Sequence, residues 1–187
     1  MALCLALPAA VLAADADNRF AVKGAGGVKC SDYVAAYDEK RDVLVTFGGW
    51  IDGFVTATNH YEPGLFDLAP WQTNELLAYA LVGFCRKNGD VHFYQAMMAM
   101  KNQLVGNGLK KASPSVVAKH EGKAVVLYAV MLERVRKELL ALGKLEQMPT
   151  SQEFDEQTVQ ALKSFQRDAG IEQTGVPDQI TLSRLLR

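Results

Sequence analysis

Apolar residues recur at helical intervals over most of the chain, and turn-forming residues separate one such stretch from the next. The pattern predicts helices over 32–42, 47–61, 75–87, 91–105, 131–142, 156–169 and 179–187. Polar residues suited to N-caps precede most of them, namely Ser31, Thr73 or Asn74, Asp90, Asp155 and Asp178. The predicted fold class is mainly α, with two small helical domains.

The segment between the two sets of helices is ambiguous. Ser113-Pro114 is a plausible helix start, whereas two valine-rich runs on either side of Glu121-Gly122 are typical of a short β-hairpin. We favour the hairpin. The domain boundaries that follow are a helical domain over 30–108, a connector over 109–127 and a second helical domain over 128–187.

The residue patterns of two predicted helices, 47–61 and 131–142, also predict what lies on their faces. Gly48, Gly49 and Gly53 leave one side of the second helix nearly free of side chains, which predicts that another backbone packs there. In the helix that starts near Met131, the apolar residues share one face, and Arg136 lies on the opposite face with other basic residues.

The start of the chain, MALCLALPAAVLAADA, is typical of a secretory signal, with cleavage expected between Ala13 and Ala16. The apolar run is too short to span a bilayer, so no integral membrane segment is predicted. Residues 17–29 form a flexible, glycine-containing lead-in. Export makes a disulfide between Cys30 and Cys85 the expected state, the alternative being two separate buried thiols. That bond would hold the first helical domain together.

Composition and motifs exclude several classes of function. The formal net charge of −1 gives no electrostatic basis for nucleic-acid binding. His60, His92 and His120 have no neighbouring ligands at metal-binding spacing, and the chain lacks GxSxG, SxxK and GxxxxGK[ST] motifs. We therefore expect no cofactor, no metal and no catalytic residues.

Trp71, in the irregular FDLAPW segment, is the candidate for a partner interface.

The last third of the chain carries a specific pattern, FDEQTVQALKSFQRDAGI followed by TGVPD and TLSRLL. This pattern resembles the three-helix peptidoglycan-binding domain of bacterial envelope proteins over about 132–187. The resemblance implies a glycan or stem-peptide ligand, with Phe154, Gln157, Thr174 and Asp178 at the rim of the site. One departure is the stretch GKLEQMPTSQEFDEQ, which replaces the family's Asp-Gly-containing turn before the middle helix.

The first domain resembles small disulfide-containing periplasmic proteins of the HdeA and Rap1a/Tai types, through Cys30-x-x-Tyr33, Trp50-x-x-Gly53 and Phe84-Cys85. Together these features predict a non-enzymatic protein of the periplasm of a Gram-negative bacterium. Its second domain would bind peptidoglycan, and its first would bind an envelope protein. The alternatives are an HdeA-like acid chaperone or immunity-type inhibitor, a structural subunit of an envelope secretion or motility complex, and an unrecognised wall hydrolase.

Overall fold

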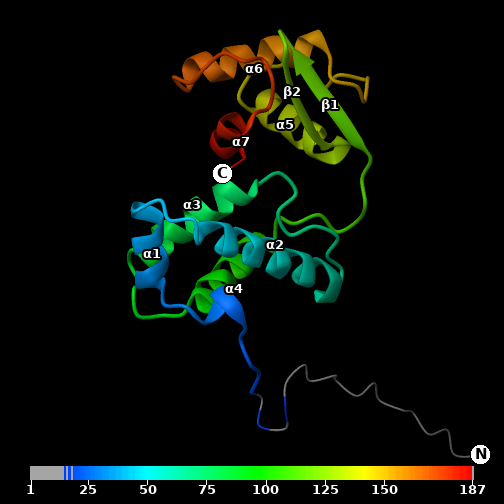
Figure 1. Cartoon of the computed structure of the whole chain (residues 1–187). Helices are drawn as coiled ribbons and strands as arrows, with labels where there is room; N and C mark the ends of the chain where they lie inside the picture. The colour runs from blue at the N-terminus through cyan, green and yellow to red at the C-terminus, as the bar shows by residue number, and fades with distance from the viewer. Residues whose placement is uncertain (1–14, 16, 18, 187) are drawn as a thin grey trace, which may run out of the picture.

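The computed structural model describes residues 15, 17 and 19–186, so the predicted signal sequence lies, apart from Asp15, outside the described residues. The first group of elements is η1 (Gly24–Gly27), α1 (Cys30–Asp38), α2 (Leu44–Tyr61), α3 (Asn74–Cys85) and α4 (Phe93–Leu104). The second group is β1 (Ser115–His120), β2 (Lys123–Tyr128), α5 (Ala129–Ala141), α6 (Glu156–Asp168) and α7 (Gln179–Leu185). Figure 1 shows the two groups as separate bundles, and the prediction of a mainly α fold is confirmed.

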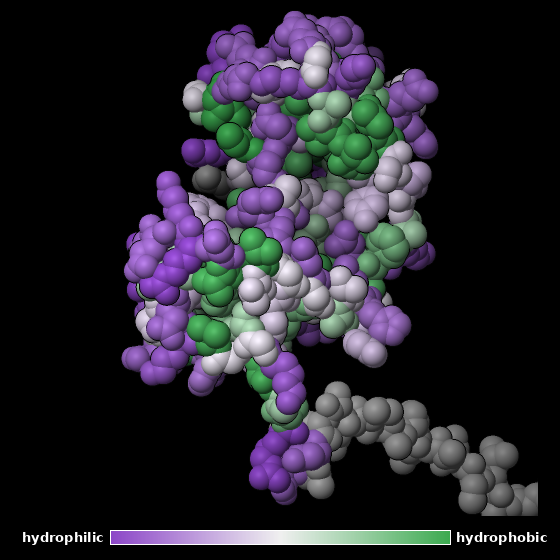
Figure 2. Space-filling model, viewed as in Figure 1, coloured by the Kyte–Doolittle hydropathy of each residue, from purple (hydrophilic) through white to green (hydrophobic). Residues whose placement is uncertain are grey.

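The hairpin is also confirmed. β1 and β2 pair antiparallel from Ser115 opposite Tyr128 to His120 opposite Lys123. The two turn residues both have positive φ, 46° at Glu121 and 79° at Gly122, as a tight hairpin turn requires. Hydrophobic residues appear on the surface at the place of the hairpin, whereas hydrophilic residues cover α6 (Figure 2). The hairpin therefore has apolar residues on both faces: Val117 and Val126 are exposed, whereas Ala118 and Leu127 are buried. The buried face packs against α5.

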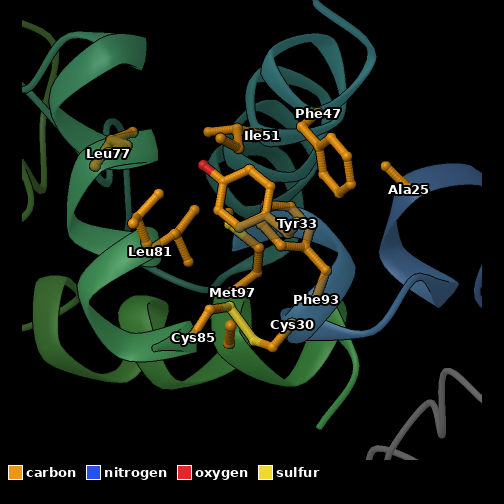
Figure 3. Close-up of a cluster of buried hydrophobic side chains, with 12 residues drawn as sticks. Ala25, Cys30, Tyr33, Phe47, Ile51, Leu77, Leu81, Cys85, Phe93 and Met97 are labelled. Carbon is orange, nitrogen blue, oxygen red and sulfur yellow. A yellow bond between two sulfur atoms is a disulfide. The ribbon is translucent and has the colours of Figure 1, made fainter. Parts of the chain in front are cut away.

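The core of the first bundle is built around Tyr33, which is 1% exposed. Its ring packs against Phe47 and Phe93, with ring centroids 4.7 and 4.6 Å away, and aliphatic residues of α2 and α3 close the cluster (Figure 3). The Tyr33 hydroxyl donates a hydrogen bond to the carbonyl oxygen of Ala78 at 2.9 Å. Aromatic packing and one satisfied polar group therefore tie α1 to α2, α3 and α4.

The expected disulfide joins Cys30 to Cys85, and the prediction is confirmed. Cys30 is the first residue of α1 and Cys85 the last residue of α3, so the bond connects two helix ends. Both side chains are buried at the edge of the aromatic cluster, where the yellow S–S bond lies in Figure 3. The disulfide is therefore part of the first core.

The buried Tyr33 makes the first bundle sensitive to alkali. Burial raises its pKa from 10.0 to about 12, so between these values the phenol ionises in the unfolded chain but not in the folded one. Stability is complete below pH 10 and falls by up to about 3 kcal/mol as the pH rises to 12. We expect Tyr33→Phe to flatten this fall, measured as urea midpoints at pH 9 and 11.5. Tyr79→Phe, at a residue 65% exposed, is the control and should leave the fall with pH unchanged.

The second bundle has its own buried residues, in two adjoining clusters. One cluster joins α5, α6 and α7, and the other joins the hairpin to α5 through Ala118, Leu127 and Met131. Phe154 and Leu186 pack against both clusters. The hairpin is therefore part of this bundle's core, although the sequence indicated a connector over 109–127.

The expectation that Asp90 caps the fourth helix is wrong. α4 has His92 as its N-cap, and the His92 backbone N–H donates to the Gln95 side chain at 2.9 Å. The physical reason is an isolated bridge between Lys29 and His92, which keeps the residues before α4 extended. The same bridge precedes α1, which begins at Cys30 with Lys29 rather than Ser31 as N-cap.

The glycines of α2 also differ from expectation. A Cβ at Gly49 or Gly53 would meet no atom within 4 Å, so no backbone packs against them. At Gly48 the neighbour is a side chain, because the Asn74 amide donates to the Gly48 carbonyl at 2.8 Å and to Asp52 at 2.7 Å. The glycines therefore admit one polar contact from α3 rather than a second helix.

The two bundles meet through α7 and the segment before α3. The Gln179 side chain donates to the Trp71 carbonyl at 3.0 Å and accepts from the Thr73 backbone N–H at 2.7 Å. The Trp71 ring, half-buried, packs against both clusters of the second bundle. In Figure 1, α7 lies on the side of its bundle that faces α3. Trp71 was predicted to lie at a partner interface, and the structure places it at the interface between the two bundles.

Candidate functional site

The segment from 142 to 155, called here the α5–α6 loop, contains the departure from the peptidoglycan-binding pattern. It leaves α5 through Gly143, whose φ of 66° turns the chain as a helix C-cap does. Leu145 is buried in the core, and Lys144 pairs with Asp168 at the far end of α6. The loop is thus attached to the bundle at its start.

Arg136 fastens the other end of the loop. Its guanidinium donates to the carbonyl oxygens of Ser151 at 2.8 Å and Glu153 at 2.5 Å, to the Thr158 hydroxyl at 2.9 Å and to Asp155 at 2.8 Å. The side chain is only 4% exposed. The expectation that Arg136 lies on an outer, basic face is therefore wrong, because the loop folds over it and supplies partners for its planar fork.

Three cavities border the α5–α6 loop, and we call them the loop cavities. One, of about 440 Å³, lies between the loop and the start of α5. The others, of about 390 and 510 Å³, lie beside the first turns of α6. Neutral hydrogen-bonding side chains are frequent in their walls, namely those of Gln147, Thr150, Ser151, Gln152, Gln157 and Gln160. Amides and hydroxyls both donate and accept, so these walls suit a ligand rich in amides and hydroxyls.

Lysine side chains pair with two of the carboxylates near the loop cavities. The hydrogen bond from Lys137 lowers the pKa of Glu133, which lines the first cavity. A hydrogen bond from Lys144, which lines the third cavity, lowers the pKa of Asp168. The lysine hydrogen bonds favour the ionised form of both carboxylates. Glu146 and Glu156 also line the cavities beside α6 and form no ion pair with another described residue, so a ligand there meets acidic as well as neutral groups.

Two of the predicted rim residues lie at the start of α6. Gln157 is exposed and lines the second and third loop cavities. Phe154 is half-buried and packs against both clusters of the bundle, which fixes the entry of the chain into α6. Asp155 follows as the N-cap and accepts from the Thr158 backbone N–H at 2.7 Å. Gln157 is thus the predicted residue whose polar group is best placed to meet a ligand.

The other two predicted rim residues hold the turn before α7. Thr174 is 7% exposed, and its hydroxyl donates to Asp178 at 2.6 Å. Asp178 is the N-cap of α7 and accepts from the Thr181 backbone N–H at 2.8 Å. Neither residue lines a loop cavity. Their contact with a ligand stays a prediction, but the structure gives both of them internal partners.

Gln166 organises this turn from within the core, and it was not among the predicted site residues. It is fully buried and donates to Thr174 at 2.8 Å, to Thr181 at 2.8 Å and to the Val176 carbonyl at 3.0 Å. Its oxygen accepts from the Gly175 backbone N–H at 2.9 Å. The signal was present in the sequence, because Gln166 continues the apolar row of α6 and a polar residue in such a row needs buried partners.

The described residues contain no group of three or more His, Cys, Asp or Glu side chains arranged to hold a metal ion. Within the same part of the chain, no helix combines the length and the hydropathy needed to cross a bilayer.

Comparison with known proteins gave one match. Neither the search of curated proteins nor the search of solved structures found a similar protein, so the resemblance of the first bundle to the HdeA and Rap1a/Tai types is not supported. Residues 131–185, which run from α5 to the end of α7, match the family model described as "Putative peptidoglycan binding domain". The match covers less than half of the chain, and it names a binding domain rather than a catalytic one. The second bundle, with the α5–α6 loop and its cavities, is therefore similar to a peptidoglycan-binding domain.

Proposed function

We propose that this protein is an exported, non-enzymatic binding protein that its second bundle attaches to peptidoglycan, while its first bundle binds an envelope protein. The observation that carries the proposal is the family match over 131–185, which lies within a bundle that has its own core. The buried disulfide of the first bundle supports an oxidising compartment, for which we propose the periplasm of a Gram-negative bacterium.

The loop cavities are the proposed contact with the wall. Peptidoglycan presents acetamido groups, peptide amides and hydroxyls, which are neutral partners for the glutamine and hydroxyl side chains of the cavity walls. Gln157 stands between two cavities and is the proposed central contact. Thr174 and Asp178 would act by keeping the turn before α7 in place.

Retention on isolated peptidoglycan sacculi tests the proposal. The purified mature chain should co-sediment with sacculi and release when soluble wall fragments are added. A chain that stays in the supernatant at all concentrations would refute wall attachment. Zymography on embedded sacculi is run in parallel, because a cleared zone would contradict the non-enzymatic assignment.

Gln157→Ala should weaken sacculus retention about three- to tenfold, the loss expected for one or two hydrogen bonds to a ligand. Gln157 is exposed on a helix, so alanine should leave the fold intact. The matched control is Gln103→Ala, at an exposed glutamine of α4 in the first bundle. Equal retention of both variants would remove Gln157 from the site without refuting wall attachment.

A further inference from the structure

An apolar groove of about 650 Å³ lies along the first bundle between α3 and α4. We call it the α3–α4 groove. One end is lined by Trp71 and Gln72, together with Ser183 from α7, and the other end by Lys87 and Asn88. It therefore follows the length of α3 and begins where the two bundles meet.

The residues that line the groove have the spacing of a helix seam. On α3 they include Leu76, Ala80 and Gly83, in steps of four and three, and the row continues to Lys87 just past the helix. On α4 the lining residues Ala96, Met100 and Gln103 repeat the same steps. Alternating steps of three and four place side chains in a line that interlocks with another helix. Two such lines side by side form the two walls of a site for a third helix.

The middle of the α3 row is unusually open. Ala80 and Gly83 are both exposed, and a Cβ added at Gly83 would meet no atom within 4 Å. A helix lying there can bring its own side chains close to the α3 backbone. An apolar groove lined at helical spacing, with small residues at its centre, is the geometry that receives an amphipathic helix.

One end of the α3–α4 groove carries a positive charge, that of Lys87. Of the described residues that line the groove, Lys87 alone is charged, and it forms no ion pair with another described residue. The nearby Arg86 is already paired with Asp38 at 2.6 Å. An acidic side chain on the partner would complement Lys87, whereas a basic one would meet an unpaired like charge.

We propose that the α3–α4 groove binds an amphipathic helix of a partner protein, about three turns long, with an acidic residue at the end that lies beside Lys87. The length follows from α3, whose 12 residues span about 18 Å. This inference rests on the partner-binding half of the proposed function and names the class of partner. It does not depend on wall attachment.

Selection from a library of random 14-residue helical peptides tests the proposal. Peptides are selected on the immobilised full mature chain, with counter-selection on Gly83→Trp, in which an indole fills the groove. The control variant is Gly53→Trp, at an exposed helical glycine of α2 that also has open space around it. Circular dichroism and thermal melting first establish that both variants are folded.

The enriched peptides should carry apolar residues at alternating steps of three and four and an Asp or Glu near one end. By fluorescence anisotropy, Gly83→Trp should bind them at least tenfold more weakly, and Gly53→Trp should bind them as the natural chain does. Lys87→Glu should cost about two- to fivefold, and peptides whose acidic residue is changed to lysine should regain that loss. Recovery of binding on this exchange of charges would show that the acidic residue of the peptide lies beside Lys87.

The proposal is overturned if no peptide is enriched, if the enriched peptides lack the apolar spacing, or if they bind Gly83→Trp and the natural chain alike. It is also overturned if dodecanoate binds the natural chain but not Gly83→Trp while no peptide is enriched, because the groove would then hold an acyl chain. Sacculus retention is measured on the same variants. It should be unchanged in Gly83→Trp, so failure of the groove proposal and failure of wall attachment give different results.

Discussion

Replacing both disulfide cysteines by alanine, in the double variant Cys30→Ala/Cys85→Ala, should lower the free energy of unfolding of the first bundle by about 4 kcal/mol. The bond joins residues 55 positions apart, and in the chain-entropy model removing a cross-link of that length frees the unfolded chain by this amount. Urea unfolding followed by far-ultraviolet circular dichroism measures the effect.

The natural chain after reduction serves as the control for the cysteine variant. Reduced protein and double variant should unfold at the same urea concentration, because both lack the cross-link and keep the remaining core. The second bundle contains neither cysteine, so its part of the transition should move little. A loss below 1 kcal/mol would show that the unfolded first bundle is already restrained without the disulfide.

The second large effect is expected for Arg136→Met, which should destabilise the second bundle by about 3 kcal/mol. Methionine preserves much of the side-chain volume but removes every donor of the guanidinium. The carbonyls of Ser151 and Glu153, together with Asp155, would then lose their buried partner. The α5–α6 loop should detach, and sacculus retention should fall with it. Thermal melting and sacculus sedimentation measure the two consequences.

Arg134→Met is the matched control for this variant. Arg134 lies on the same helix and makes one longer hydrogen bond, 3.3 Å to the Asn107 carbonyl. Its loss should cost less than 1 kcal/mol and leave the α5–α6 loop attached. If both arginine variants melted alike, the hydrogen bonds of Arg136 would not be what holds the loop.

Local signals in the sequence predicted most of the helices correctly. Asp155 and Asp178 cap α6 and α7 as expected, and Gly143 and Gly170 follow α5 and α6 with positive φ. These signals act within four or five residues, so they can be recognised without knowing the fold. The disulfide was predictable for a different reason, because Cys30 and Cys85 are the only cysteines of the sequence besides Cys4.

Long-range partners were not predictable in the same way. His92 replaces Asp90 as a cap because Lys29, more than sixty residues earlier, pairs with it. Arg136 is buried because a loop that follows its helix returns over it. A basic side chain on the outer face of an isolated helix gives no sign of such a cover. The packing of the whole bundle decides it.

In the candidate site too, local sequence signals were readable and long-range partners were not. Gln157 lines two of the loop cavities, and its position could be inferred because it lies in the first turn of a well-capped helix. Thr174 and Asp178 were chosen for their polar groups, yet Gln166 and the α7 backbone take up those groups. Ligand contact at these turns stays a prediction, but the hydrogen bonds show that Thr174 and Asp178 have internal partners.

The contact of Trp71 and Gln179 has a practical consequence for anyone who divides this chain. A fragment ending before the hairpin would present the Trp71 ring to water, and a fragment beginning there would lose the ring that packs on its two clusters. The Gln179 amide would lose both of its backbone partners in the second fragment. Cutting the chain at that boundary would expose apolar surface or an unpaired amide on each fragment. Self-association of the isolated fragments would then be a result of the cut and would not show how the natural protein behaves.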